Sequence, residues 1–133
     1  MSHVTQITIG SMTFNAAQAP AVEQDELMSY ISATAMERVF NLARNGIEQP
    51  SEKTLVPMFM SMPQNVKQRV AAILTGKVTV SGTNTRVSVA DFGGKMVEWN
   101  ILLAKLLEWN LSDFFTWLQS EVEEEKPAAR EKV

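Results

Sequence analysis

Apolar and polar residues alternate near the start of the chain, from Val4 to Phe14. The alternation is centred on Gly10-Ser11, a pair that suits a tight two-residue turn. This pattern predicts a short β-hairpin. An isolated hairpin is only marginally stable in water, so it must pack on helices or pair with a strand of another subunit.

Beyond Pro20 the apolar residues recur at the spacing of a helix. Leu27 and Ile31, for example, share one helical face. Thr34 begins a possible capping box, and Asn45-Gly46 supplies a left-handed stop. This region is therefore predicted to form either two helices or one bent helix.

Two further helices are predicted in the middle of the chain. The first spans residues 51–60 and contains Pro57, which removes a backbone donor and limits the regularity of the helix. The second begins at Pro63, which suits the first turn of a helix, and ends at Gly76. Residues 77–87 alternate weakly and predict a loop or a small second hairpin.

A long apolar segment, residues 88–109, predicts the central helix of the fold. Ser88 and Asp91 have the spacing of a helix start, and Gly93-Gly94 is a weak point within the segment. Ser112 can cap a last helix. The chain should therefore contain about five helical elements.

The complete pattern predicts a mainly α fold, a small helical bundle with a short N-terminal β-hairpin. Residues 1–120 are expected to form a single domain, because a chain of 133 residues that is 45% hydrophobic suffices for one core. Residues 121–133 are rich in charge and lack apolar periodicity, so they predict a disordered acidic C-terminal tail.

The cysteine content and the charge narrow the classes of function. The chain has no cysteine, which excludes disulfide bonds and thiolate metal sites. Its formal charge of -3 has the wrong sign for sequence-independent binding to phosphates, so we expect no nucleic-acid partner. No apolar run approaches the roughly 20 residues that cross a bilayer, so we expect no membrane association and a cytoplasmic location.

The residues that usually carry catalysis are missing or badly placed. His3 is the sole histidine, and near a chain end it lacks the fixed partner that a general base requires. Gly93-Gly94 fits neither a dinucleotide-binding nor a phosphate-binding motif. The carboxylates of residues 121–125 lie on a solvated helix end, which cannot hold a hard cation in a fixed geometry. We therefore predict no enzyme activity, no cofactor and no metal site.

Large apolar residues lie both on and off the helix faces that should be buried. The expected core stripe of the central helix contains Phe92, Met96, Trp99, Leu103, Leu106 and Leu107. Other residues, on the opposite arc of that helix and on the last helix, are candidates for partner binding or self-association: Ile101, Leu102, Trp109, Phe114, Phe115 and Trp117. Either the central helix is buried nearly all round, or these residues meet another chain.

Three stretches of the sequence occur in an order known from one protein family. They are the N-terminal hairpin, residues 19–27 (Ala-Pro-Ala-Val-Glu-Gln-Asp-Glu-Leu) and residues 109–115 (Trp-Asn-Leu-Ser-Asp-Phe-Phe). Together they resemble the tail assembly chaperones of long-tailed, siphovirus-type bacteriophages. The Ser-Asp-Phe-Phe segment carries the resemblance most strongly.

Members of that family are small, mostly helical, non-catalytic factors. The resemblance implies that this chain binds the tape-measure protein and promotes the assembly of tail-tube subunits around it. It also implies a location in the host cell cytoplasm and absence from the mature virion. A factor that covers a long partner needs repeated copies, so we expect a homo-oligomer.

Two other functions fit the same sequence. A structural tail-completion or adaptor subunit would use similar apolar contacts but stay in the virion. A small DNA-binding regulator would use the basic residues between Arg44 and Arg86, although these are scattered rather than gathered on one recognition helix. Presence in purified particles would identify the first, and salt-dependent binding to duplex DNA would identify the second.

Overall fold

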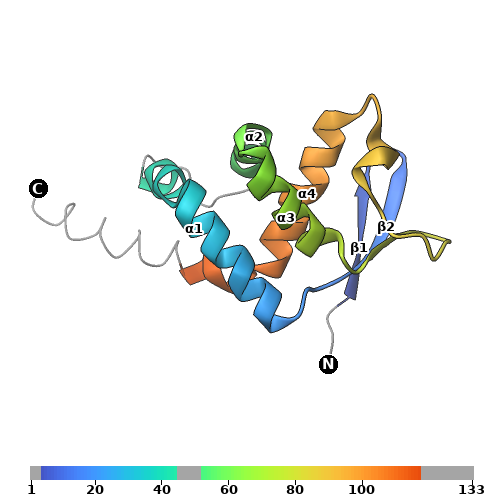
Figure 1. The fold of residues 1–133 in the computed structure, drawn as a ribbon, viewed down its shortest axis with the longest axis horizontal. Helices are drawn as coiled ribbons and strands as arrows, with labels where there is room; N and C mark the ends of the chain where they lie inside the picture. Colours follow the sequence, from blue (N-terminus) through green and yellow to red (C-terminus); the bar gives the residue numbers. More distant parts are fainter. Residues whose placement is uncertain (1–3, 45–51, 118–133) are drawn as a thin grey trace, which may run out of the picture.

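The fold combines a three-stranded antiparallel sheet with helices packed beside it (Figure 1). The computed structural model describes residues 4–44 and 52–117. Strands β1 (Val4–Ile9), β2 (Met12–Ala17) and β3 (Val78–Val80) lie in the order β1-β2-β3. The sheet therefore joins the start of the chain to a segment from its middle.

The hairpin predicted from the alternating pattern is confirmed. β1 and β2 pair directly, with Ile9 opposite Met12 and the turn at Gly10-Ser11. Gly10 has a φ of +59°, a left-handed conformation that residues with a Cβ adopt only at a cost. A Cβ at this position would also lie 3.1 Å from the Glu98 carboxylate oxygens. Glycine thus suits both the turn and the close approach of Glu98.

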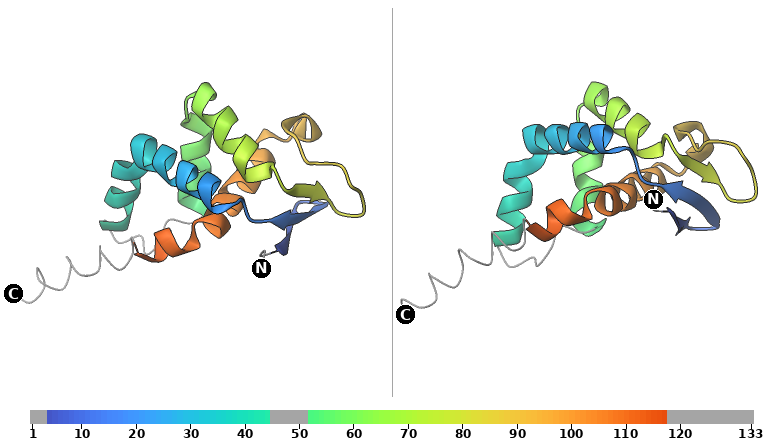
Figure 2. Two further views of the ribbon diagram at one scale, coloured as in Figure 1. Left: turned by 60° about the horizontal axis from the view of Figure 1, so that its bottom comes forward. Right: turned by 90° about the horizontal axis from the view of Figure 1, so that it is seen from below.

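The helical part of the chain is divided into these elements: α1 (Ala21–Arg44), α2 (Glu52–Ser61), α3 (Gln64–Thr75), the 3-10 helix η1 (Val89–Phe92) and α4 (Met96–Asn110). Residues 112–117 are also helical. α1 is a single helix that changes direction along its length, which is one of the two forms expected for this region (Figure 2). The predicted stop at Asn45-Gly46, the predicted start at Ser51 and the predicted tail over 121–133 lie outside the described residues.

The prediction of a mainly α helical bundle is wrong, because the fold is mixed α/β. β3 pairs with β2, with Phe14 opposite Val80, and Thr79 forms a further bridge with Arg86. The weak alternation over residues 77–87 is therefore a small second hairpin that extends the sheet. β3 pairs with β2, which lies about 60 residues earlier in the chain, and a pairing between such distant segments leaves no local signal in the sequence. β3 also occupies the edge of β2 that could otherwise have paired with another subunit.

α4 lies at the centre of the hydrophobic core. Leu102, Leu103, Leu106 and Leu107 have no exposed area. The helix packs against α2, α3 and β1, so apolar side chains on several of its faces find neighbours within the same chain. Of the two explanations for its broad apolar surface, burial on nearly all sides holds for most of its length.

The long helix predicted from Ser88 onward is broken in two. Ser88 and Asp91 do form a capping box, in which the Ser88 amide donates to Asp91 Oδ2 at 2.9 Å, but it starts only the short η1. Gly94, with a φ of +76°, then turns the chain, and α4 begins at Met96. Met96 was predicted to lie on the core stripe, but it now begins a new helix and its side chain is 47% exposed.

The linker from the sheet to α1 is fixed to the C-terminal end of α4. The Ala19 amide donates to Asn110 Oδ1 at 2.8 Å, and Gln18 Nε2 donates to the Trp109 carbonyl at 3.0 Å. Asn110 is itself buried, and its Nδ2 donates to the Leu106 carbonyl at 2.9 Å. One side chain thus satisfies a buried backbone amide and holds two distant segments together.

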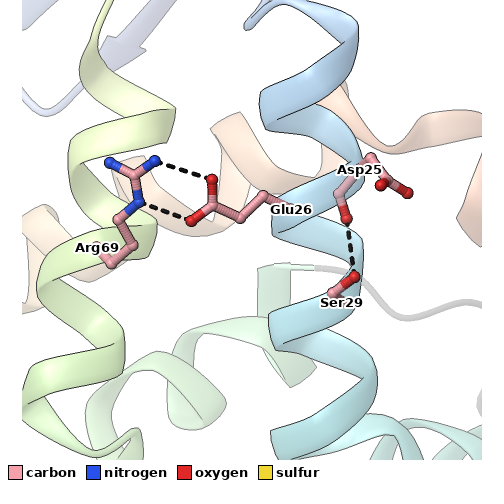
Figure 3. A network of polar contacts seen from close by, with 4 residues as sticks. All are labelled: Asp25, Glu26, Ser29 and Arg69. Carbon is pink, nitrogen blue, oxygen red and sulfur yellow. Dashed lines mark hydrogen bonds and ion pairs between the residues drawn. The ribbon is translucent and has the colours of Figure 1, made fainter.

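An ion pair at the surface connects α1 to α3 (Figure 3). Arg69 donates through Nε and Nη2 to the two carboxylate oxygens of Glu26, at 2.7 and 2.8 Å. The close view also shows Ser29 Oγ donating to the Asp25 carbonyl, one turn back along α1. The hydrogen bonds from Arg69 lower the pKa of Glu26, and Glu26 in turn raises the pKa of Arg69.

This pair should make stability depend on pH in acid. The pKa of Glu26 is lower in the folded state than its ordinary value of 4.5, so the stabilisation is fully present above that value and is lost as the pH falls through the folded-state pKa. Urea denaturation at pH 7, 5 and 3 should show Arg69→Gln to be less stable than the wild type at pH 7, with the difference shrinking toward pH 3. Lys77→Gln, at an exposed lysine outside this ion pair, is the control. A difference that stayed constant with pH would contradict the role given to Glu26.

Candidate protein-binding surfaces

The six candidate contact residues from the sequence fall into three environments. Leu102 has no exposed area, and Phe114 and Phe115 are also buried. Ile101 and Trp109 are partly buried and pack against the core. Trp117 is 51% exposed and so presents most surface to a partner.

Leu102 must be corrected as a contact residue. The helical wheel placed it on the arc opposite the core stripe, but Leu102 has no exposed area and so offers no surface to a partner. Phe114 and Phe115 likewise act first as core residues. Their rings meet edge to face, with centroids 5.2 Å apart and an interplanar angle of 65°.

Trp117 stands at the rim of an apolar hollow between α1 and the helical residues 112–117. The hollow has a volume of about 410 Å³ and is lined by Met28, Ser32, Asp113, Phe114 and Trp117. The rings of Trp117 and Phe114 are tilted by 33° with centroids 6.0 Å apart, so the buried ring supports the exposed one. We call this surface the Trp117 hollow.

Local hydrogen bonds fix the helix that carries Trp117. The Leu111 amide still bonds to the Leu107 carbonyl at the end of α4, and the Phe115 amide bonds to the Leu111 carbonyl at 3.1 Å. Thr116 Oγ1 donates to the Ser112 carbonyl at 2.9 Å. The predicted restart of the helix at Ser112 is confirmed, and Trp117 remains half exposed beside the buried Phe114 ring.

A second concave surface lies at the other end of α4, between α3, residues 86–89 and the first turns of α4. Its volume is about 340 Å³, and the residues that line it include Lys67, Ala71, Arg86, Val89, Met96 and Asn100. Val89 and Met96 are each about half exposed, at 50% and 47%. We call this surface the Lys67 groove.

The charge of Lys67 is not balanced within the described chain. Its Nζ donates to Asn100 Oδ1 at 2.6 Å, but Asn100 is neutral. Neither Lys67 nor Arg86 forms an ion pair with another residue of the described part. Burial lowers the pKa of Lys67, which is the effect of a partly desolvated ammonium without a carboxylate beside it. A bound anion would offset that cost.

The sequence pattern does not predict the Lys67–Asn100 pair. In the sequence, Lys67 is one of the scattered basic residues, and Asn100 lies inside the apolar segment of the central helix. The sequence does contain one indication of the pair. Asn100 is a polar residue in an apolar helix, and a buried side-chain amide needs hydrogen-bond partners. Asn100 finds two of them, Lys67 and the Met96 carbonyl, to which its Nδ2 donates at 2.7 Å.

Within residues 4–44 and 52–117, no three side chains of histidine, cysteine or acidic type gather to hold a metal ion. No helix in the same part of the chain is both long and apolar enough to span a bilayer.

Comparisons with known protein families, with curated proteins and with solved structures each found no match. A function for this chain is therefore inferred from its sequence, the Trp117 hollow and the Lys67 groove.

Proposed function

We propose that this protein is a non-catalytic tail assembly chaperone of a long-tailed bacteriophage. It binds the tape-measure protein in the host cell cytoplasm, promotes the assembly of tail-tube subunits and leaves before the virion is complete. The observation that carries this proposal is the Trp117 hollow, an apolar concavity with a half-exposed tryptophan at its rim. Tryptophans in such positions are frequent anchors of protein interfaces.

The location of the hollow also supports the proposal. The Ser-Asp-Phe-Phe segment, on which the family resemblance mainly rests, contributes Asp113 and Phe114 to the lining. Met28, on the opposite side, adds a flexible apolar side chain that adapts to different partners. An apolar hollow of this kind suits the apolar face of a partner helix, which would insert side chains spaced three or four residues apart.

Replacing Trp117 tests this function. Trp117→Ser should reduce capture of the co-expressed tape-measure protein by about tenfold or more, because the anchor is lost, while the free energy of unfolding changes by less than about 1 kcal/mol. Affinity purification of the full chain followed by quantification of the bound tape-measure protein measures the effect. Val22→Ser is the matched control, since Val22 is 82% exposed on α1 and does not line the hollow.

Two results would count against the proposal. Equal capture by Trp117→Ser and the wild type would remove the hollow as the binding surface. Detection of the protein in purified virions would favour the alternative of a tail-completion or adaptor subunit that stays in the particle.

A further inference from the structure

The charges of this chain are unevenly distributed along its sequence. The Lys67 groove displays two cations, Lys67 and Arg86, that have no carboxylate partner among the described residues. The acidic residues of the C-terminal region are concentrated in the segment Glu-Val-Glu-Glu-Glu, residues 121–125. The chain thus carries an anionic segment and a cationic groove that complement each other.

The apolar part of the groove also matches that segment. Val89 and Met96 expose apolar surface beside the cations, and Ala71 adds to the floor. Glu121-Val122-Glu123 places one small apolar side chain between two carboxylates. Carboxylates that accept hydrogen bonds from a lysine and an arginine form charge-assisted contacts, which are stronger than neutral ones.

The first turns of α4 contribute to the lining of the groove. The described chain ends beyond the other end of this helix (Figure 2). Asn100 and Asn110 are about 15 Å apart along the helix axis, at 1.5 Å per residue, and residues 112–117 continue beyond Asn110. The four residues from Trp117 to Glu121 span at most about 14 Å. That reach is shorter than the distance along α4 alone, so Glu121 does not reach the groove of its own molecule, whereas docking in another molecule has no such restriction.

We infer that the Lys67 groove binds the acidic segment 121–125 of a second copy of this chain. The contact is heterologous, since the groove of one copy meets the tail segment of the next. Contacts of this type add copies in an open series unless the rotation between neighbours closes a ring. The inference goes beyond the proposed function, because it uses a different surface and a different partner.

The test is a charge swap measured by light scattering coupled to size-exclusion chromatography, over a range of concentrations. The groove variant carries Lys67→Glu and Arg86→Glu, and the tail variant carries lysine at Glu121, Glu123, Glu124 and Glu125. The wild type should form multimers that grow with concentration and dissociate in high salt, because salt screens the contact. Each variant alone should stay monomeric. An equimolar mixture of the two should associate again, since each acidic surface then meets a basic one.

One control and one milder groove variant keep the test decisive. Lys77→Glu makes a similar charge change at an exposed lysine outside the groove lining and should leave the multimers unchanged. Lys67→Gln with Arg86→Gln retains a donor for Asn100, so it avoids the fold damage that a glutamate could cause. It should weaken self-association by about a hundredfold, because it removes both cations and with them two charge-assisted hydrogen bonds.

The outcomes separate this inference from the proposed function. A wild type that is monomeric at every concentration, or multimers that persist in the tail variant, would overturn the inference. Failure of the mixture to associate, with both variants folded by circular dichroism, would overturn it as well. Trp117→Ser should leave the multimers intact. Loss of tape-measure capture in this variant would therefore say nothing against self-association through the Lys67 groove.

Discussion

Replacing Phe92 with alanine should lower the free energy of unfolding by about 3–5 kcal/mol, the usual cost of removing a buried phenylalanine. Phe92 has no exposed area and lies between the sheet and α4. Its ring centroid is 5.8 Å from that of Phe14 in β2 and 5.4 Å from that of Trp99 in α4. The substitution therefore opens a cavity where the two parts of the fold meet.

Urea denaturation followed by far-UV circular dichroism measures this loss, and near-UV circular dichroism reports the packing of the aromatic side chains, Trp99 among them. Since small domains are stable by only about 5–15 kcal/mol, the variant should be partly unfolded at physiological temperature. Val89→Ala is the matched control on the same short helix. Val89 is half exposed, so its truncation should cost no more than about 0.5 kcal/mol. Similar losses in both variants would mean that Phe92 does not link the sheet to α4.

The same aromatic contacts explain why the central helix was predicted too long. Gly93-Gly94 was recognised as a weak point in the sequence, but a weak point becomes a break only if the flanking segments gain from separate packing. Phe92 gains by stacking on Phe14, which brings η1 against the sheet. That gain depends on a strand at the start of the chain, so a local pattern does not reveal it.

Local signals did suffice for the elements that depend on neighbouring residues. The hairpin follows from the alternation and from the turn glycine Gly10, which has the expected left-handed φ. α3 ends at Thr75, directly before Gly76, as the sequence predicts. The strand β3, with three residues, owes its existence to pairing with β2 and is too short to be recognised alone.

The candidate surface residues show the same limit. A helical wheel gives the direction of a side chain but not the number of neighbours around the helix. It identified Trp117 as lying off the buried face, and Trp117 is exposed. It gave Leu102 the same status, although Leu102 is enclosed by the core. The difference is that Leu102 lies on α4, which other elements of the fold surround, whereas Trp117 lies beyond the end of that helix.

Two asparagines on α4 offer the sharpest comparison within the core. The tripeptide Glu-Trp-Asn occurs twice, ending at Asn100 and at Asn110. Both asparagines are buried, and each donates from Nδ2 to the carbonyl four residues earlier, at 2.7 and 2.9 Å. They differ in what their Oδ1 atoms accept: Asn100 accepts from the Lys67 ammonium and Asn110 from the Ala19 amide.

Asn110→Leu should therefore lower the free energy of unfolding by about 1–3 kcal/mol, because the Ala19 amide is left buried without an acceptor. Asn100→Leu should cost less than about 1 kcal/mol, since the partly exposed Lys67 side chain can turn its ammonium to water. Both substitutions remove the same bond within the helix, so the difference between them isolates the two partners. Urea denaturation gives the two free energies, and hydrogen exchange of the Ala19 amide should become faster in Asn110→Leu alone. Equal losses, or an Ala19 amide that stays protected in Asn110→Leu, would show that Asn110 does not hold the linker to α4.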